Sequence, residues 1–402
     1  MPTSWPSIVK QESASLKINL DNLIRKNLSN IAFVTIDGED AKDFDDAVFC
    51  VEHNDGYDLY VAIADVSLYV KPESSIDKEA INRGTSIYFP NFVIPMLPEI
   101  LSNNLCSLRP NEDRPSLVVK INLDKDCYLK KYNFFSAIIH SHARLTYTEV
   151  ENNSFESPLS NAVIDSLKDL KSLAHKRIAI KEERGAVRIH SKEHLIKIND
   201  DGTSKSISFR KNIFANQMIE ECMLLANECA ADLLNNRYGY APFRIHEEPD
   251  KLKLETLKKI LGGNVQLQNP QDPASQINSI SKKISAKDQL KQSLILQTMK
   301  RAEYSTENVG HFGLQLDQYC HFTSPIRRYP DLLTHRMIKS CIEDDDDYSG
   351  NKKNDQELCE ISSKLEHRAE NASRKVNQIL IFDYLKRHVG ESFEGVISGV
   401  TE

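Results

Sequence analysis

Residues 31–51 read IAFVTIDGEDAKDFDDAVFCV, and their pattern sets the order of the first structural elements. Two apolar runs, 31–36 and 47–51, are rich in β-branched and aromatic residues, as buried strands are. Between them, residues 37–46 carry six carboxylates against one lysine, a net charge of −5. The pattern predicts a strand, an acidic loop and a second strand.

Further strand signals follow this unit, and helical signals come after them. The turn signal Asn54-Asp55-Gly56 leads into an apolar run at 59–64, and two more strands are expected within 115–140. After Tyr147, apolar residues recur at three- and four-residue spacing, which is typical of amphipathic helices. The expected helices are 161–184, 212–237, 251–261, 279–299 and about 356–388.

Four aspartates of the acidic loop, Asp37, Asp43, Asp45 and Asp46, point to a metal site. Two carboxylates about 4 Å apart repel by roughly 4 kcal/mol at an effective dielectric of about 20, so such a cluster needs a cation. Short, hard carboxylates suit Mg²⁺ or Mn²⁺ bound together with substrate phosphate. A calcium loop is excluded, because the Gly and Glu that its spacing requires are missing. A solvated acidic loop is the alternative, although it usually lacks flanking buried strands.

The segment HFTSPIRRYPD, residues 321–331, is a possible partner for this loop. Ser324 and Pro325 are residues preferred at the N-cap and the first position of a helix. Arg327 and Arg328 would then stand in the first turn, where a helix already attracts phosphate. In the alternative, the arginines of a capped helix only pair with neighbouring carboxylates.

The composition is that of an ordinary soluble chain, with 402 residues, 40% hydrophobic side chains and a net charge of −7. The sequence contains no run of about eighteen apolar residues, so no transmembrane helix is predicted, and the first residues lack the features of a signal peptide. Eight cysteines occur singly, which fits reduced thiols in the cytoplasm rather than a disulfide or zinc framework. The charge argues against nonspecific coating of nucleic acid but not against a local basic channel. The acidic run at 343–347 is expected to be a solvated loop.

Together these motifs resemble the catalytic RNB domain of the ribonuclease II superfamily, and most closely the ribonuclease R family of bacteria. The resemblance rests on DGEDAKDFDD at 37–46 and HFTSPIRRY at 321–329, and it spans about residues 31–390. Other matching stretches are 62–67, 83–90, 94–98, 101–103, 105–108, 182–185 and 219–227. It implies an α+β fold in which a mixed β-sheet is wrapped by helices around a channel for single-stranded RNA. It also implies processive, Mg²⁺-dependent hydrolysis of RNA from the 3′ end to nucleoside 5′-monophosphates.

The resemblance also implies the roles of single residues. The metal site, which Mn²⁺ could also occupy, falls on Asp37, Asp43, Asp45 and Asp46. Asp45 matches the aspartate whose loss typically abolishes cleavage, and it is expected to be catalytic together with Asp43. Arg327 matches the arginine that contacts the phosphate at the scissile bond and is expected to be catalytic as well.

RNA contacts are implied at several further positions. Tyr88 matches a tyrosine that stacks on a base near the 3′ end, and Tyr147 matches another tyrosine of the active-site region. The aromatic residue that commonly clamps the terminal bases opposite Tyr88 falls on Ile189, so the clamp is one-sided or His190 supplies its second side. The HFTSPIRRY segment is expected to contribute Ser324, Arg327 and Arg328.

We expect residues 1–30 to be a linker after absent cold-shock domains, residues 31–390 the RNB domain, and residues 391–402 the first strand of a truncated S1 domain. The expected partner is single-stranded RNA with a free 3′ end, bound by a cytoplasmic monomer without a membrane or an obligate protein partner. Two rivals are a catalytically silent RNB protein that binds RNA as a regulator, and a DNA exonuclease with the same metal chemistry. The intact aspartates argue against the first, and 2′-deoxy substrates would test the second.

Overall fold

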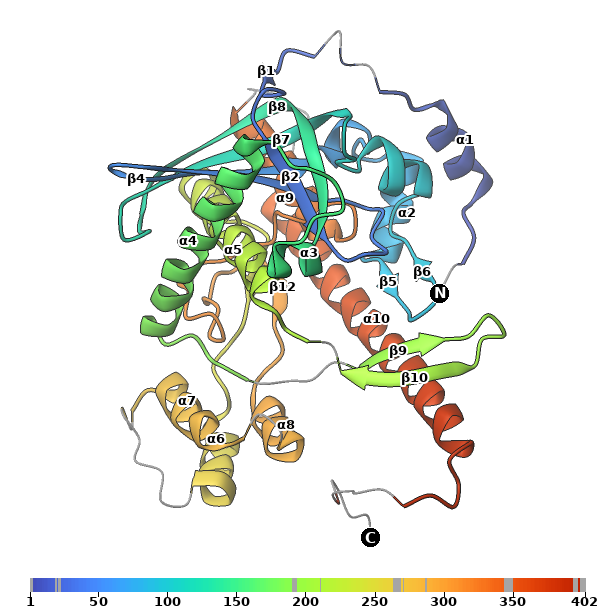
Figure 1. Cartoon of the computed structure of the whole chain (residues 1–402), viewed down its shortest axis with the longest axis vertical. Coiled ribbons are helices and arrows are strands. Elements are labelled where there is room, and N and C mark those ends of the chain that lie inside the picture. Colours follow the sequence, from blue (N-terminus) through green and yellow to red (C-terminus); the bar gives the residue numbers. More distant parts are fainter. Residues whose placement is uncertain are drawn as a thin grey trace.

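The computed structural model describes residues 3–18, 20, 23–189, 194–209, 211–262, 269, 271–285, 288–342, 350–392 and 397 (Figure 1). Within these ranges, no helix is long and apolar enough to cross a membrane. All eight cysteines are free and seven of them are buried, in agreement with the prediction of reduced thiols. The acidic run at 343–347 lies outside the described residues.

Six strands form the central sheet, in the spatial order β1-β8-β2-β3-β4-β7. β7 also pairs with β8, so five of these strands make a closed ring. The ring closes because β8 is 18 residues long and pairs with β7 over its first part and with β2 over residues 141–146. The strands are β1 (Lys26–Asn27), β2 (Phe33–Asp37), β3 (Asp46–His53), β4 (Gly56–Ala64), β7 (Asp113–Leu123) and β8 (Leu129–Thr146). They confirm the strands predicted at 31–36, 47–51, 59–64 and within 115–140.

The β3–β4 turn forms where the Asn-Asp-Gly signal predicts it, with His53 opposite Gly56. Gly56 has a φ of 139°, and a Cβ there would lie 2.0 Å from the carbonyl oxygen of Leu123. Because only glycine combines this backbone angle with so close an approach, the residue fixes how the hairpin meets β7.

Helices and short strands make up the rest of the described chain. Three small antiparallel pairs join β5 (Ile87–Tyr88) to β6 (Val93–Ile94), β9 (His194–Ile198) to β10 (Ser204–Phe209), and β11 (Phe243–Ile245) to β12 (Glu303–Ser305). The helices are α1 (Ser7–Ser15), α2 (Ser75–Arg83), α3 (Tyr147–Asn152), α4 (Asn161–Glu183), α5 (Phe214–Tyr238), α6 (Lys251–Leu257), α7 (Pro273–Lys283), α8 (Gln289–Thr298), α9 (Tyr329–Ile342) and α10 (Lys352–Lys386). A 3₁₀ turn, η1 (Val66–Leu68), and two π-helical turns, η2 (Leu101–Leu105) and η3 (Lys258–Gly262), complete the elements.

The prediction of one helix over residues 279–299 is wrong, because the structure has α7 and α8 in this region. The side chain of Asp272 caps the start of α7, which therefore begins earlier than expected. The carboxylate of Asp288 accepts a hydrogen bond from the amide of Lys291 at 3.2 Å and begins a new helix. Apolar periodicity continues across the break because both helices face the same hydrophobic cluster.

Hydrophobic clusters lie on both faces of the sheet, as the alternation of side chains along a strand requires. Val34 belongs to the cluster covered by α4 and α5, whereas its neighbour Phe33 belongs to the cluster covered by α2 and α9. A third cluster, which contains Ile277, joins α6, α7 and α8. Figure 1 shows these three helices together below the main body. The predicted α+β architecture, a mixed sheet wrapped by helices, is confirmed.

The segment that we expected to be a linker, residues 1–30, contains α1 and β1 and is partly built into the domain. Val9 of α1 is buried in the same cluster as Phe33, and β1 pairs with residues 137–138 of β8. Only two residues of α1 are buried, so its sequence carries little helical periodicity.

At the other end, α10 is close to the helix predicted at 356–388. Residues 393–396 and 398–402, which hold most of the expected S1 strand, lie outside the described residues. The domain boundary near residue 391 therefore stays a prediction.

Candidate active site

The acidic loop and the arginine segment meet, although 281 residues separate Asp45 from Ile326 in the chain. Asp37 ends β2 and Asp46 begins β3, so the aspartates lie at the ends of two neighbouring strands. The Oδ1 atom of Asp45 accepts a hydrogen bond from the amide of Ile326 at 2.9 Å. Its Oδ2 atom lies 3.5 Å from Nε of Arg327. The fold thus brings together the two motifs that the sequence suggested as partners.

Burial and mutual repulsion make the charged forms of these carboxylates unfavourable. Burial is the main cause that raises the pKa of Asp37, and repulsion from Asp43 adds to it. Burial likewise raises the pKa of Asp45 well above its usual value, although Arg327 opposes the shift. Burial and repulsion from Asp37 raise the pKa of Asp46 to about 7. A cation placed among these carboxylates would relieve both the burial cost and the repulsion.

The donor set suits a cation that the protein and a phosphate hold jointly. Among the described residues, no three His, Cys, Asp or Glu side chains are grouped so that they could hold a metal ion alone. Mg²⁺ is usually bound by one or two carboxylates, waters and substrate phosphates rather than by an all-protein cage. The four aspartates would therefore need substrate phosphate and water to complete a Mg²⁺ site, and Asp37, Asp43, Asp45 and Asp46 stay predicted ligands.

Two residues that the site assignments do not include shape the acidic loop. The Ser107 hydroxyl donates to the carbonyl oxygen of Lys42 at 2.8 Å and accepts from the amide of Phe44 at 3.0 Å. The Arg144 guanidinium donates to the carbonyl oxygens of Gly38 and Glu39, both at 2.6 Å. Ser107 lies in the stretch 105–108 that matches the family, and this match was the only sequence feature that pointed to a role for it. Arg144 carried no signal.

Tyr88 lies at the edge of this loop, at the end of β5. Its hydroxyl donates to Oδ2 of Asp43 at 2.8 Å, and the residue is 44% exposed. A tyrosine that is anchored by its hydroxyl and still open on its ring suits base stacking. The stacking itself stays a prediction.

Arg327 and Arg328 differ sharply although they are neighbours. The Arg327 side chain is 42% exposed, and its Nη2 donates to the Ser324 hydroxyl at 2.8 Å. The Arg328 side chain is only 17% exposed and binds the fully buried Asp331 at 2.7 Å. For Arg328 the structure thus shows the alternative, a pairing with a neighbouring carboxylate. Ser324 is also buried, and its hydroxyl accepts the hydrogen bond that holds the Arg327 side chain.

The expected helix start at Ser324 and Pro325 is wrong, because α9 begins at Tyr329. The backbone before α9 binds another part of the chain instead. Ser86 donates its amide to the carbonyl oxygen of Arg327 at 2.9 Å, and Tyr329 donates to that of Gly84 at 3.0 Å. These bonds hold the arginine segment as a turn against the strand that leads to Tyr88.

Tyr147 and Ile189 lie in different surroundings. Tyr147 begins α3 directly after Thr146, which is the register partner of Asp37, so it lies near the aspartates. Ile189 packs against the cluster of α6, α7 and α8. His190, its suggested substitute in the base clamp, lies outside the described residues. Base contacts by these residues stay predictions.

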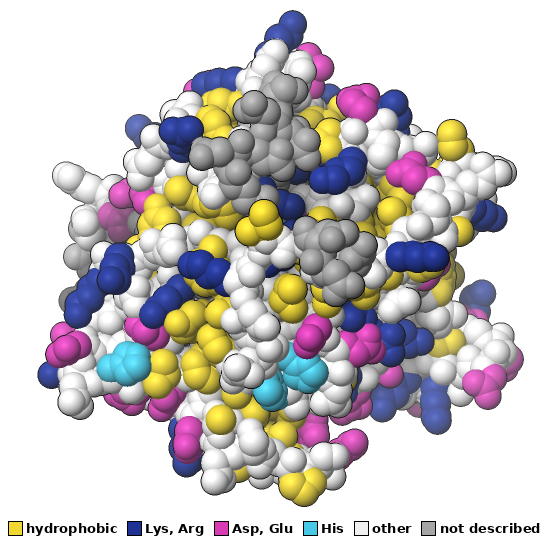
Figure 2. Space-filling view, turned by 90° about the horizontal axis from the view of Figure 1, so that it is seen from above, with side chains coloured by type: hydrophobic (Ala, Val, Ile, Leu, Met, Phe, Trp, Pro, Cys, Tyr) yellow, Lys and Arg dark blue, Asp and Glu magenta, His cyan; other side chains and the backbone are white. Residues whose placement is uncertain are grey.

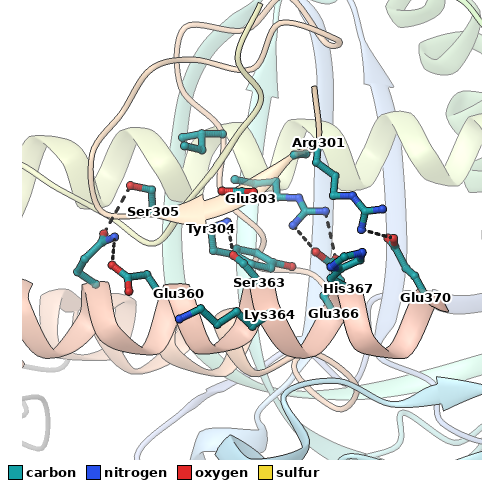
Figure 3. Close-up of a pocket in the computed structure, with 14 residues that line it drawn as sticks. Arg301, Glu303, Tyr304, Ser305, Glu360, Ser363, Lys364, Glu366, His367 and Glu370 are labelled. Atoms are coloured by element: carbon teal, nitrogen blue, oxygen red, sulfur yellow. Dashed lines mark hydrogen bonds and ion pairs between the residues drawn. The ribbon is translucent and has the colours of Figure 1, made fainter. Parts of the chain in front are cut away.

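A cavity of about 470 Å³ lies between β11, β12 and α10 (Figure 3). Arg244 binds Glu366 through two bonds of 2.6 and 3.1 Å, and Arg301 binds Glu370 at 3.1 Å. The guanidinium groups of the cavity are therefore already neutralised. Figure 2 likewise shows Lys and Arg interspersed with Asp and Glu on the face seen from above. The aspartate loop, where burial raises the pKa of Asp37, Asp45 and Asp46, is therefore the candidate active site.

Comparison with known proteins identifies the family of this chain. A family model of the RNB domain matches residues 25–344, and the chain belongs to this family. Among curated proteins, it is similar to ribonuclease R of Vibrio parahaemolyticus and of Escherichia coli, at 39% identity over 100% of this chain in both cases. It covers 51% and 52% of these relatives, and so spans about half their length.

Solved structures give the same picture. The chain is similar to Mycoplasma genitalium RNase R in complex with ribose-methylated single-stranded RNA, with a TM-score of 0.94, 34% identity, and coverage of 100% of this chain and 65% of that one. The complex of that protein with double-stranded RNA has the same TM-score and identity, and the chain covers 74% of it. Yeast Ssd1, described as a pseudonuclease, has a TM-score of 0.71 at 21% identity and covers 88% of this chain and 45% of that one. The last likeness shows the fold alone.

Proposed function

We propose that this chain is the catalytic region of an exoribonuclease of the ribonuclease R type. It hydrolyses single-stranded RNA processively from the 3′ end and releases nucleoside 5′-monophosphates. The observation that carries the proposal is the contact of Asp45 with both Ile326 and Arg327, because it joins a charge-rich carboxylate loop to an exposed arginine. Relatives named ribonuclease R, and a relative solved with single-stranded RNA, support the choice of substrate.

Each residue has a part in the proposed reaction. Asp37 and Asp46 would hold Mg²⁺, and Asp43 and Asp45 would hold a second ion or orient the attacking water. The chemistry that bound Mg²⁺ supplies is activation of water and neutralisation of phosphate charge. Arg327 binds the scissile phosphate and offsets the charge that develops on it, since a guanidinium matches phosphate oxygens with two donors.

Tyr88 sets the position of the 3′ end in this proposal. Its ring stacks on a base without reading the identity of that base. Because its hydroxyl is bound to Asp43 at 2.8 Å, the stacked base is held at a fixed distance from the carboxylates. The phosphodiester that is hydrolysed therefore lies at a constant distance from the 3′ end of the RNA. We also propose that the chain is cytoplasmic and monomeric. Size-exclusion chromatography would test the monomeric state.

A 5′-labelled thirty-mer incubated with the chain and Mg²⁺ tests the function. We expect a ladder that shortens one nucleotide at a time, ends at very short oligonucleotides and disappears with EDTA. Fragments of middle length, or labelled mononucleotide at the first time point, would refute the 3′-to-5′ direction. An all-deoxy thirty-mer should stay intact, and its degradation would favour the DNA exonuclease.

The catalytically silent alternative is the second candidate, because Ssd1 shares the fold. RNA binding without any product in Mg²⁺ or Mn²⁺ would favour it. The four aspartates of the loop are all present and three have carboxyls with raised pKa values, which supports the active form instead.

Replacing Arg327 with Lys should lower cleavage more than RNA binding. A lysine keeps the charge but loses the fork that now reaches both Ser324 and Asp45. We expect kcat to fall about tenfold to a hundredfold, with the Kd for oligoadenylate changed less than threefold. Single-turnover rates and fluorescence anisotropy measure the two quantities. An equal loss in both would make Arg327 a general electrostatic contact.

A further inference from the structure

The N-terminal segment holds helix α2 at both of its ends. We call Ser4, Trp5 and Glu12 the N-terminal clasp. At the start of α2, the Glu12 carboxylate accepts a hydrogen bond from the amide of Ser75 at 2.9 Å. At its end, the Arg83 guanidinium lies 3.5 Å from the centroid of the Trp5 ring and donates to the carbonyl oxygen of Ser4 at 3.1 Å. A short helix is thus fixed against the chain that precedes the sheet.

Arg83 is buried, and each part of its guanidinium has a partner. Nε donates to Glu79 at 2.9 Å within α2, and Nη1 donates to the carbonyl oxygen of Pro95 at 3.0 Å. The Trp5 indole nitrogen donates in turn to Glu99 at 3.1 Å. A buried arginine with a hydrogen bond from each of its three nitrogens cannot shift without breaking several of these contacts. The clasp therefore holds the last turn of α2 in place, just before the C-cap at Gly84.

The chain runs from Arg83 directly into the active site. Gly84 has a φ of 71°, and a Cβ there would lie 2.7 Å from Leu365 of α10, so the turn has little freedom. Thr85 and Ser86 both donate to the carbonyl oxygen of Arg327, at 3.0 and 2.9 Å. Two residues further on, the Tyr88 hydroxyl binds the acidic loop. One segment of six residues thus connects the end of α2 to both parts of the site.

We propose that Trp5 and Arg83 are positioning residues, which set the register of Tyr88 and Arg327 through residues 84–88. The inference rests on the proposed function for its catalytic consequence. A misplacement of about 1 Å at a reacting centre can cost roughly a hundredfold in rate. Loosening the clasp is therefore expected to lower kcat roughly tenfold, leave KM within about twofold and lengthen the final product.

Hydrogen exchange tests the positioning itself without any activity. In Trp5→Ala, amides in residues 84–89 and the amide of Tyr329 should exchange at least about tenfold faster, while those of β7 stay unchanged. Ile8→Ala, at a 61% exposed position of α1, is the matched control and should match the wild type. Unchanged exchange at residues 84–89, or an equal increase over the whole chain, would overturn the proposal. Glu12→Ala removes the acceptor of the Ser75 amide and loosens only the start of α2, so it is the milder variant if Trp5→Ala fails to fold, and it too should speed exchange at residues 84–89.

A double-mutant cycle tests the route to catalysis. If the clasp acts through Tyr88, Trp5→Ala should lengthen the final product in the wild-type background but not in Tyr88→Ala. Trp5→Phe keeps a ring over Arg83 and should restore most of kcat. Additive effects on product length would overturn the coupling. A wild-type chain that never shortens RNA would reject the proposed function instead, while the exchange result would still decide the positioning.

Discussion

Replacing Asp45 with Asn is expected to slow RNA cleavage about a thousandfold, which corresponds to about 4 kcal/mol of transition-state stabilisation. The amide oxygen of Asn can still accept the hydrogen bond that Ile326 donates to Oδ1 at 2.9 Å, so the two loops stay together. What is lost is the charge that Arg327 and a metal ion require. Single-turnover cleavage of a 5′-labelled oligonucleotide measures the rate, and anisotropy with the same RNA should give a nearly unchanged Kd.

Asp40→Asn is the matched control for this variant. Asp40 belongs to the same loop but is exposed and is not a predicted ligand. It should cleave within about twofold of the wild-type rate. Turnover of Asp45→Asn at the wild-type level would contradict the assignment of the site, and an equal loss in both variants would indicate that the loop acts only through its total charge.

The second large effect is expected on stability, for Asp65→Asn. Asp65 is buried, lies 3.2 Å from Lys339, and is also bound to Arg25, so a single carboxylate serves two cations. Removing it leaves two buried positive charges unpaired, which typically costs about 3–5 kcal/mol. Urea unfolding followed by circular dichroism measures the free energy. Asp165→Asn, at a surface ion pair that is 68% exposed, should change it by less than about 1 kcal/mol.

The same residue gives a pH dependence. Burial alone would raise the pKa of Asp65, but Lys339 and Arg25 outweigh it and hold the pKa well below its usual value. A lowered pKa in the folded state means that the stabilisation is complete above the unfolded value, near about 4, and is lost as the pH falls below it. The stability of Asp65→Asn should therefore depend less on pH below about 4. Parallel acid curves for the two proteins would contradict this.

The sequence by itself determined the parts of the site that are contiguous in the chain. The acidic loop and its two flanking strands are local, because alternation and the Asn-Asp-Gly turn act over a few residues. It also determined that the four aspartates share one loop and that the family motifs are present. These features depend only on residues that are close together in the sequence.

Tertiary structure decided what each residue of a motif faces. Arg327 and Arg328 are the same residue type at adjacent positions, yet one lies beside Asp45 and the other beside buried Asp331. No local rule distinguishes them, since the choice depends on residues 84–86 pairing with the segment before α9. The start of α9, the loop contacts of Ser107 and Arg144, and the packing of α1 on the sheet domain have the same origin. Each depends on hydrogen bonds or burial between segments far apart in the chain, and such contacts leave no periodic pattern in the sequence.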